Sequence, residues 1–241
     1  IYGVHINKEK YSKPDTVSEV FDGIWKWKPK PTIDSAICAQ GIDSLAALST
    51  EMEMKDGDKR GQRRAKEFSE GLRKTCRKVE KENWLIVCTN QEREGDSGPV
   101  TPGGKGIPYY ASLRIRLTQA FPKWKIEKTI SYEGKELKSL IGVMTHCRVN
   151  KSSIDRPFRE ADFSIIYDYG IHDVMANLQY YKETRNLSRY MAVNKSFQAL
   201  EDASAHIEGK NLEGDLREMV IDLWEDVQKA FEVKRKLKVR F

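Results

Sequence analysis

Long apolar runs, closely spaced cysteines and clustered histidines are all missing from this 241-residue chain. No stretch of 18 apolar residues occurs, so the sequence predicts no membrane-spanning helix and no membrane partner. No basic flank precedes an apolar stretch in the manner of a signal peptide. The four cysteines lack C-x-x-C spacing and the four histidines lack an H-E-x-x-H pattern, which argues against a zinc site or a disulfide scaffold. We therefore expect a cytoplasmic protein with reduced, structural thiols.

Charge, in contrast, is abundant in this sequence. The composition is 39% hydrophobic and 32% charged, with a formal net charge of +6. Such a chain can bury a core of useful size, and its basic balance permits a polyanionic partner without identifying one. The length suits one domain, or one domain with an appendage. Because the first residue is Ile1 rather than Met, we interpret the sequence as a fragment, a processed chain or the downstream part of a longer one.

The order of the predicted elements favours an α/β fold. Helical spacing occurs over residues 17–27 and 63–82, and buried strands are predicted at 33–42 and 84–88. Consecutive strands follow, with Gly134 marking a hairpin turn between the first two, at 125–130, 140–149 and 162–167. This order predicts a mainly parallel sheet that continues into antiparallel strands.

A change of pattern at Gly170 predicts a domain boundary. The apolar stripe that runs from Leu216 to Phe231 has clean helical spacing, and Asp215 could cap the start of that helix. We therefore expect a core over residues 1–170 and a small helical region over 171–241.

An acidic residue follows the first buried strand, where Asp43 and Ser44 come directly after Ile42. A carboxylate at a strand end is the Walker B arrangement, in which it holds a water of a nucleotide-bound Mg²⁺. The alternative is that Asp43 caps the short helix or turn predicted at 45–48. The residues alone leave both interpretations open.

Amide side chains and a glycine-rich loop follow the next strand. Gln91, after Asn90, could orient an attacking water or sense a γ-phosphate, or it could be a plain polar strand end. In the loop at 95–106, Gly104 and Lys105 suggest a phosphate-binding P-loop. The pattern G-x-x-x-x-G-K-[ST] fails, however, because Pro99 and Gly106 occupy its first and last positions and a strand-like segment follows. The loop favours contacts to a nucleic-acid phosphate backbone instead, with a surface loop as the alternative.

Basic side chains gather around the polar loop at 55–62, and again at the end of the strand 140–149. The first group could converge with the glycine-rich loop on one polyanion, because parallel strands end at the same edge of a sheet. A solvated face is the alternative for each group. The residues are Lys55, Lys59, Arg60, Arg63, Arg64 and Lys66 in the first group, and Arg148 and Lys151 in the second.

In combination and in this order, these segments resemble the RecA-type recombinases, over nearly the whole chain to about residue 170. The likeness covers the Walker B strand, both DNA-binding loops, the nucleotide-sensing glutamine and the stretch with the inter-subunit lysine. The divergence favours a phage-encoded or otherwise remote member. The matching segments are KPDTVSEVFDGI, IDSLAALS, EMEMKDGDKRGQRRAKEFSEGLRK, TNQERE, TPGGKGIPYYASLRIRL and RVNKSSIDRPFREADFSIIYDYGI.

The resemblance implies a RecA-like P-loop ATPase core that uses ATP and Mg²⁺. Catalytic roles would fall to Asp43 and Gln91, with Asp43 reaching Mg²⁺ through water. The nucleotide would be bound by Asp43, Ser44, Asn90 and Gln91, and by Lys151 from the adjacent protomer, while Tyr109 and Lys151 would lie at the subunit interface. The family's second lysine falls at Val149, where Arg148 could substitute. DNA contacts would come from Lys59, Arg60, Arg63, Arg64, Lys66, Ser69, Arg73, Arg93, Thr101, Gly103, Gly104 and Lys105.

A phosphate cradle is missing, because no Walker A sequence occurs in the chain. In the resembling family it lies upstream of the position of Ile1, together with the glutamate that activates water. The missing part could belong to the full-length protein or to another chain, or the protein could be an inactive relative. We expect a DNA-dependent ATPase that forms helical filaments on single-stranded DNA and pairs it with homologous duplex, and we expect this chain alone to be inactive. The alternatives are a non-catalytic, filament-modulating paralogue and another RecA-fold motor, such as a hexameric helicase.

Overall fold

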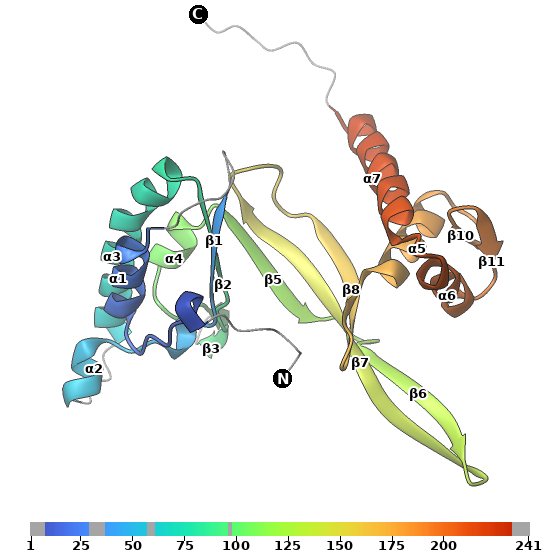
Figure 1. Cartoon of the computed structure of the whole chain (residues 1–241), viewed down its shortest axis with the longest axis horizontal. Helices are drawn as coiled ribbons and strands as arrows, with labels where there is room; N and C mark the ends of the chain where they lie inside the picture. Colours follow the sequence, from blue (N-terminus) through green and yellow to red (C-terminus); the bar gives the residue numbers. More distant parts are fainter. Residues whose placement is uncertain (1–7, 29–36, 57–60, 96–97, 233–241) are drawn as a thin grey trace, which may run out of the picture. The chain divides into compact units, whose positions relative to one another are not determined.

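The computed structural model describes residues 8–28, 37–56, 61–95 and 98–232 (Figure 1). The chain divides into two compact units, Ile1–Arg114 and Ile115–Phe241. Within the described ranges no helix has the length and apolar character needed to cross a membrane. The domain boundary expected near residue 170 stays a prediction, since the second unit includes residues on both sides of it.

The first unit packs two helices against a pair of parallel strands. Strand β1 (Cys38–Ile42) pairs with β2 (Trp84–Cys88) in a register that runs from Cys38 opposite Trp84 to Ile42 opposite Cys88. Helix α1 (Val17–Lys26) begins at a capping box formed by Thr16 and Glu19. Helix α3 (Gly61–Lys81) confirms the helix predicted at 63–82. The core between them consists of Val17, Val20, Ile24, Leu45, Leu48, Phe68 and Trp84.

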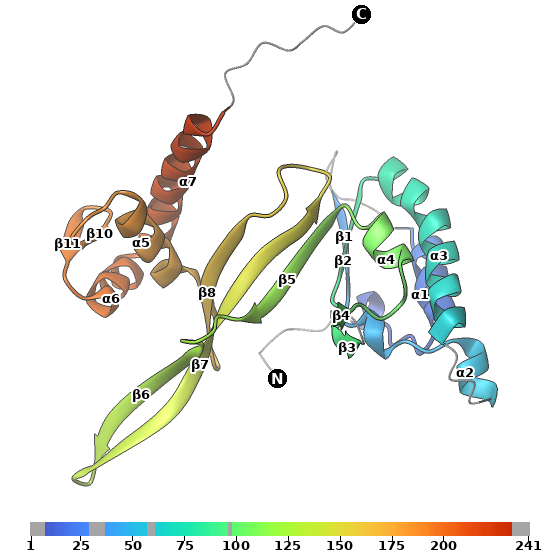
Figure 2. The ribbon, with the colours of Figure 1, turned by 180° about the vertical axis from the view of Figure 1, so that it is seen from behind.

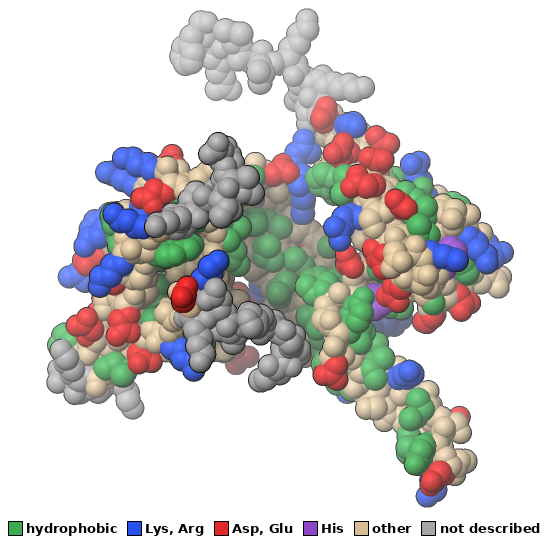
Figure 3. All heavy atoms as spheres, viewed as in Figure 1, with side chains coloured by type: hydrophobic (Ala, Val, Ile, Leu, Met, Phe, Trp, Pro, Cys, Tyr) green, Lys and Arg blue, Asp and Glu red, His purple; other side chains and the backbone are tan. Residues whose placement is uncertain are grey.

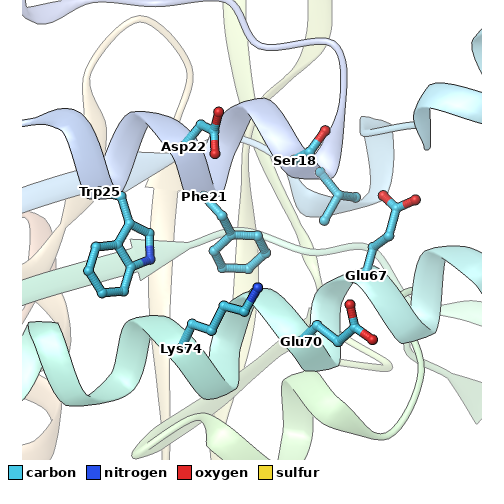
Figure 4. A pocket seen from close by; sticks show the side chains of 9 residues that line it. Ser18, Phe21, Asp22, Trp25, Glu67, Glu70 and Lys74 are labelled. Carbon is cyan, nitrogen blue, oxygen red and sulfur yellow. The ribbon is translucent and has the colours of Figure 1, made fainter.

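Helices α1 and α3 approach closely because α3 carries a glycine at their contact. The ring of Phe21 lies over Gly71, so closely that a Cβ at position 71 would overlap it. Next to this contact lies a groove of about 200 Å³, in which Trp25 from α1 and Lys74 and Glu70 from α3 face one another (Figure 4).

A buried lysine closes one end of the same core. The Lys78 ammonium lies 4.6 Å from the centre of the Trp84 ring and 2.7 Å from a carboxylate oxygen of Glu82. Trp27 packs edge-on against Trp84 at 4.8 Å. An ammonium desolvated over a tryptophan face gains on the order of 2 kcal/mol from the ring quadrupole, which helps to offset its burial.

Short elements complete the first unit and revise three expectations. The polar loop expected at 55–62 is helical at both ends, in α2 (Glu51–Asp56) and α3, while residues 57–60 lie outside the described part. The described part of the strand expected at 33–42 begins at Cys38. The loop expected at 95–106 contains a small hairpin and is followed by a helix rather than a strand. The short elements are η1 (Lys8–Lys10), η2 (Leu45–Ala47), β3 (Arg93–Gly95), β4 (Gly98–Val100) and α4 (Gly106–Tyr110).

The second unit contains a five-stranded sheet followed by helices. Its strand order is β5-β7-β8-β9, with β6 paired to β7. The β6–β7, β7–β8 and β8–β9 pairs are antiparallel. The strands are β5 (Leu113–Gln119), which begins in the first unit, β6 (Lys125–Tyr132), β7 (Lys135–Ser152), β8 (Glu160–Ile166) and β9 (Gly170–His172).

The helical end of the second unit has its own core. Helices α5 (Asp173–Thr184), α6 (Leu200–Lys210) and α7 (Glu213–Ala230) enclose Val174, Leu178, Ile207 and Leu216, beside a hairpin of β10 (Tyr190–Ala192) and β11 (Lys195–Phe197). The N-cap of α7 is Leu212, so the expectation that Asp215 caps this helix is wrong; Asp215 lies in its first turn.

The fold class is therefore α/β with both parallel and antiparallel strands. Among the pairs whose register is described, β1–β2 is parallel and the others are antiparallel, so the parallel share is smaller than the sequence predicted. The physical reason is local: hairpins such as β6–β7 need only a tight turn, whereas each parallel pair needs a crossover such as the one through α3.

Candidate functional site

The ends of β1 and β2 are joined at the sheet edge by Thr89. Its backbone N–H donates to the Ile42 carbonyl at 2.9 Å, and its carbonyl accepts from the Leu45 N–H at 3.0 Å. Its hydroxyl donates to a carboxylate oxygen of Asp43. Asp43 is exposed, and the hydroxyl of Thr89 holds its carboxylate at the carboxyl edge of the parallel pair, as expected for a strand-end carboxylate.

The capping alternative for Asp43 is wrong. The N-cap residue of η2 is Ser44, which is half-buried and makes no side-chain capping hydrogen bond. Among the described residues no three His, Cys, Asp or Glu side chains converge to hold a metal ion. The role of Asp43 toward Mg²⁺ stays a prediction.

Asn90 connects the end of β2 to the glycine-rich segment. Its side-chain amide N–H donates to the Pro102 carbonyl at 3.0 Å, and its side-chain oxygen accepts from the Gln91 N–H at 3.0 Å. The segment is also tied to the start of β5, because Arg114 donates to the Thr101 hydroxyl at 3.4 Å. The Gln91 side chain is exposed beside these bonds. Sequence reasoning identified the amide pair but missed Thr89 and the bond to Pro102.

The glycine-rich segment lies directly on α3. Gly103 is buried, and a Cβ there would overlap Ile107 and press on the Phe68 ring. A Cβ on Gly104 would lie 2.5 Å from the Ala65 Cβ. A Cβ on Gly106 would overlap the Ser69 hydroxyl. The glycines therefore allow the loop backbone to touch the helix, which is a packing role that the sequence did not predict.

The predicted DNA-contacting side chains differ in how they are engaged. Arg64 donates to the Leu48 carbonyl at 3.1 Å, and Ser69 donates to the Ala65 carbonyl at 2.9 Å, so both have internal partners. Arg63 contacts the Met52 sulfur. Exposed side chains that remain for a partner are Lys66, which lies 4.0 Å from Glu70, and Arg73, Arg93 and Lys105; Thr101 is half-buried, and Lys59 and Arg60 lie outside the described residues.

Acidic side chains on α3 lie near these basic ones and disfavour an anion there. Burial and the neighbouring Glu51, Glu53 and Glu70 raise the pKa of Glu67, and one of its carboxylate oxygens has no hydrogen-bond partner within the described structure. Glu67 points toward α1 (Figure 4), whereas Glu70 also lies within 4.0 Å of Lys66. The basic side chains Lys66 and Arg73 lie seven residues apart on α3 and therefore on one stripe. Measured around the helix from Lys66, Glu70 lies about 40° away, Lys74 about 80° and Glu67 about 100°.

The residues predicted to meet a neighbouring subunit lie on two different units. Tyr109 is 75% exposed and packs edge-on against Tyr110. On β7, Arg148 Nε lies 3.2 Å from Glu160 on β8, and His146 beside it hydrogen-bonds Asp162 at 2.6 Å. Lys151 is half-buried. Arg148 thus has an ion-pair partner within its own sheet, and its role at a subunit contact stays a prediction.

Comparison with known proteins identifies the family. The sequence model of the RecA N-terminal domain matches residues 1–172. The chain belongs to the RecA family. It is 30% identical over 182 residues to Protein RecA of Ruminococcus albus, covering 71% of this chain and 41% of that protein. It is 32% identical over 176 residues to Protein RecA of Rickettsia canadensis, covering 70% of this chain and 47% of that protein.

Family membership confirms the resemblance drawn from the sequence. The matched region spans less than half the length of these RecA relatives. Family membership and the presence of both parallel and antiparallel strand pairs support a RecA-like α/β fold, whereas the P-loop core itself and the roles of individual residues stay predictions.

Proposed function

We propose that this RecA-family chain is part of an ATP-dependent recombinase that forms filaments on single-stranded DNA and promotes homologous pairing and strand exchange. One observation carries the proposal. A strand-end carboxylate, a strand-end amide pair and a glycine-rich segment packed on a basic helix form one hydrogen-bonded and packed series within the first unit. Such a series is what a nucleotide would need in order to change a DNA-binding surface.

In this proposal each side chain has a defined task. Asp43, positioned by Thr89, holds a water of the Mg²⁺ that accompanies ATP. Ser44 lies beside it. Gln91 senses the γ-phosphate, and the bond from Asn90 to Pro102 passes its position to the glycine-rich segment. Because the sequence holds no G-x-x-x-x-G-K-[ST] pattern, residues outside it would cradle the phosphates.

Lys151 would serve ATP bound by the adjacent protomer, with Tyr109 at the contact between protomers. Arg148, three residues before Lys151, is ion-paired with Glu160 of the neighbouring strand. Arg63 and Arg64 start the basic helix, and Arg64 fixes it to the segment after Asp43 through the Leu48 carbonyl.

DNA would lie along the exposed basic stripe of α3 and the adjoining loop. Backbone N–H groups near Gly103 and Gly104 and the side chains of Lys66, Arg73, Arg93 and Lys105 would contact phosphates. Contacts of this kind are sequence-neutral, which leaves the recognition of homology to base pairing.

The first test uses the full-length protein and measures ATP hydrolysis with and without single-stranded DNA. Stimulation by DNA is expected, and its absence would favour a non-catalytic paralogue. Gln91→Ala should abolish the effect of ATP on DNA affinity while leaving affinity without nucleotide unchanged. Gln119→Ala, an exposed glutamine at the end of β5, is the matched control. Unaltered coupling in Gln91→Ala would refute its sensor role.

A second test separates the basic stripe from net charge. Lys66→Ala combined with Arg73→Ala should weaken binding to oligo(dT) and reduce the slope of log K against log salt by about 1.4, at roughly 0.7 per phosphate contact. Lys26→Ala combined with Lys74→Ala removes the same charge from the α1 side of the unit and should leave the slope unchanged. Equal losses in both double variants would argue against a DNA site on this stripe.

A further inference from the structure

Strands β6 and β7 form a two-stranded ribbon that extends past the rest of their sheet (Figures 1 and 2). Strand β8 pairs with β7 over Gly142–Arg148, whereas the pairs from Glu127 opposite Leu140 to Tyr132 opposite Lys135 involve β6 and β7 alone. Glu133 and Gly134 close the ribbon with φ values of 50° and 77°, as a tight hairpin turn requires. The free part is about 20 Å long, at about 3.4 Å per residue pair.

The two faces of this free ribbon differ in chemistry. Residues directly opposite one another in an antiparallel pair share a face, and neighbours along a strand alternate between faces. One face, here called the lysine–tyrosine face, therefore carries Lys128, Ile130, Tyr132, Lys135, Leu137 and Ser139. The other face carries Glu127, Thr129, Ser131, Glu136, Lys138 and Leu140.

The second face carries charges of both signs, whereas the lysine–tyrosine face carries positive charge alone. Lys138 lies 2.8 Å from the Glu127 carboxylate, and hydrogen bonding and charge from Lys138, with Lys125, lower the pKa of Glu127. The lysine–tyrosine face contains two exposed lysines and no carboxylate among its six residues. The face is thus uniformly positive.

Large apolar side chains lie between these lysines without cover. Tyr132 is 60% exposed, and the opposed pair Ile130 and Leu137 are 48% and 47% exposed. Figure 3 shows this run of hydrophobic side chains along the ribbon. Isolated two-stranded ribbons are marginally stable in water, so a long one that exposes apolar side chains marks a binding surface.

We propose that the lysine–tyrosine face of this ribbon is a contact element for double-stranded DNA and lies in the major groove. The major groove of B-form DNA admits a two-stranded β-ribbon. Lys128 and Lys135 would then lie near phosphates, with Ile130 and Leu137 over base edges and thymine methyl groups. The inference rests on the proposed function, in which a duplex is the second DNA partner.

A second copy of this chain fits the face less well than DNA does. A symmetric contact between two such faces would bring lysines of one copy against lysines of the other, and like charges that face one another across strands are destabilising. A polyanion meets both lysines favourably, and it leaves the second face, with its two glutamates, in solvent.

The test uses the full 241-residue chain and measures fluorescence anisotropy of a labelled 20-base-pair duplex and of labelled oligo(dT) over a salt series. Lys128→Ala combined with Lys135→Ala should lower duplex affinity about tenfold and the salt slope by about 1.8, at roughly 0.9 per phosphate contact. Binding to oligo(dT) should be unchanged. Lys125→Ala combined with Lys138→Ala removes the same charge from the other face and should leave the duplex slope intact.

Each other result overturns the inference. Equal effects of the two double variants would mean that net charge alone is responsible. A change in sedimentation without a change in duplex affinity would identify a protein interface. A wild-type chain that does not bind duplex at low salt would also overturn it. Far-UV circular dichroism establishes that each variant is folded.

The outcome separates this inference from the proposed function. Lys66→Ala with Arg73→Ala reports on the oligo(dT) signal, whereas the ribbon variants report on the duplex signal. If the ribbon variants leave duplex affinity unchanged while Lys66→Ala with Arg73→Ala lowers oligo(dT) affinity, the ribbon proposal has failed. The reverse pattern means that the DNA site on α3 has failed.

Discussion

Gly104 offers the sharpest test of how the glycine-rich segment is built. Its φ is 77°, in the left-handed region, and a Cβ there would lie 2.5 Å from the Ala65 Cβ and 3.3 Å from the Ala65 Cα. In Gly104→Ala the left-handed backbone costs about 1–2 kcal/mol, and the overlap with α3 costs about 1–3 kcal/mol more. The expected loss of about 2–5 kcal/mol is a large part of the roughly 5–15 kcal/mol that stabilises a typical domain.

Two further variants separate the backbone cost from the packing cost. Gly134 has the same φ of 77° but nothing within 4 Å of a Cβ, so Gly134→Ala should lose only about 1–2 kcal/mol. Ala65→Gly should cost about 1 kcal/mol in the wild-type helix. In the Gly104→Ala background, however, the same change removes the overlapping methyl group and should recover about 1–3 kcal/mol.

The measurement is urea unfolding of the four members of this cycle, followed by far-UV circular dichroism. Because the chain has two compact units, hydrogen exchange of the α3 amides assigns the loss to the first unit. A coupling free energy near zero between positions 65 and 104 would refute the close packing of the segment on α3. A loss in Gly134→Ala as large as that in Gly104→Ala would show that backbone conformation alone is responsible.

Three further predictions concern the same unit. Asn90→Ala should cost about 1 kcal/mol, because the Pro102 carbonyl loses its donor, and should speed hydrogen exchange in the segment at 98–106; unchanged exchange would contradict the tether. Lys78→Ala should lower the free energy of unfolding by about 2 kcal/mol through lost contacts with Trp84, whereas the exposed Arg77→Ala should change it by less than about 0.5 kcal/mol. Glu67→Gln should raise unfolding free energy at neutral pH, because burial and nearby carboxylates raise the pKa of Glu67 and its ionisation therefore opposes folding. That gain should vanish as pH falls and both states become neutral; a gain that persists in acid would contradict this cause.

Regular elements with a strong periodic pattern were predictable from the sequence. Helix α3 follows from its apolar stripe, and the β6–β7 hairpin follows from two strand-like runs around Gly134. The length of β7 was not predictable, because residues 135–139 are mostly polar and pair with β6 alone, so no buried face imposes an alternation. Helix α4 spans five residues, which is too short for a helical period to show.

The candidate site was predictable in its chemistry but not in its contacts. The sequence indicates that Asp43, Asn90 and Gln91 lie at strand ends, because each follows an apolar run. The local sequence does not predict that Thr89 donates to Asp43 or that Asn90 donates to Pro102, because both hydrogen bonds depend on the tertiary structure. In the sequence, the glycines of this segment suggest a flexible loop. In the structure, they allow the backbone to approach α3 closely.

These contacts connect the proposed nucleotide site at Asp43 with the proposed DNA-binding segment. A shift of Asp43 at the strand edge would act on Thr89, whose hydroxyl donates a hydrogen bond to the Asp43 carboxylate. The next residue, Asn90, donates a hydrogen bond to the Pro102 carbonyl. From Pro102 the chain passes at once to Gly103 and Gly104, where a Cβ would overlap Ile107 and Ala65, respectively. In the proposed mechanism, a displacement at the strand edge is therefore passed through Asn90 to the segment that packs on the helix. Close-packed interfaces respond to such shifts by changing between discrete arrangements rather than by bending gradually. The variants at positions 65 and 104 therefore also test how ATP controls DNA affinity. If Ala65→Gly loosens the contact between the segment and α3, the dependence of DNA affinity on ATP should weaken in the full-length protein. This effect would not come from charge, because Ala65 carries none.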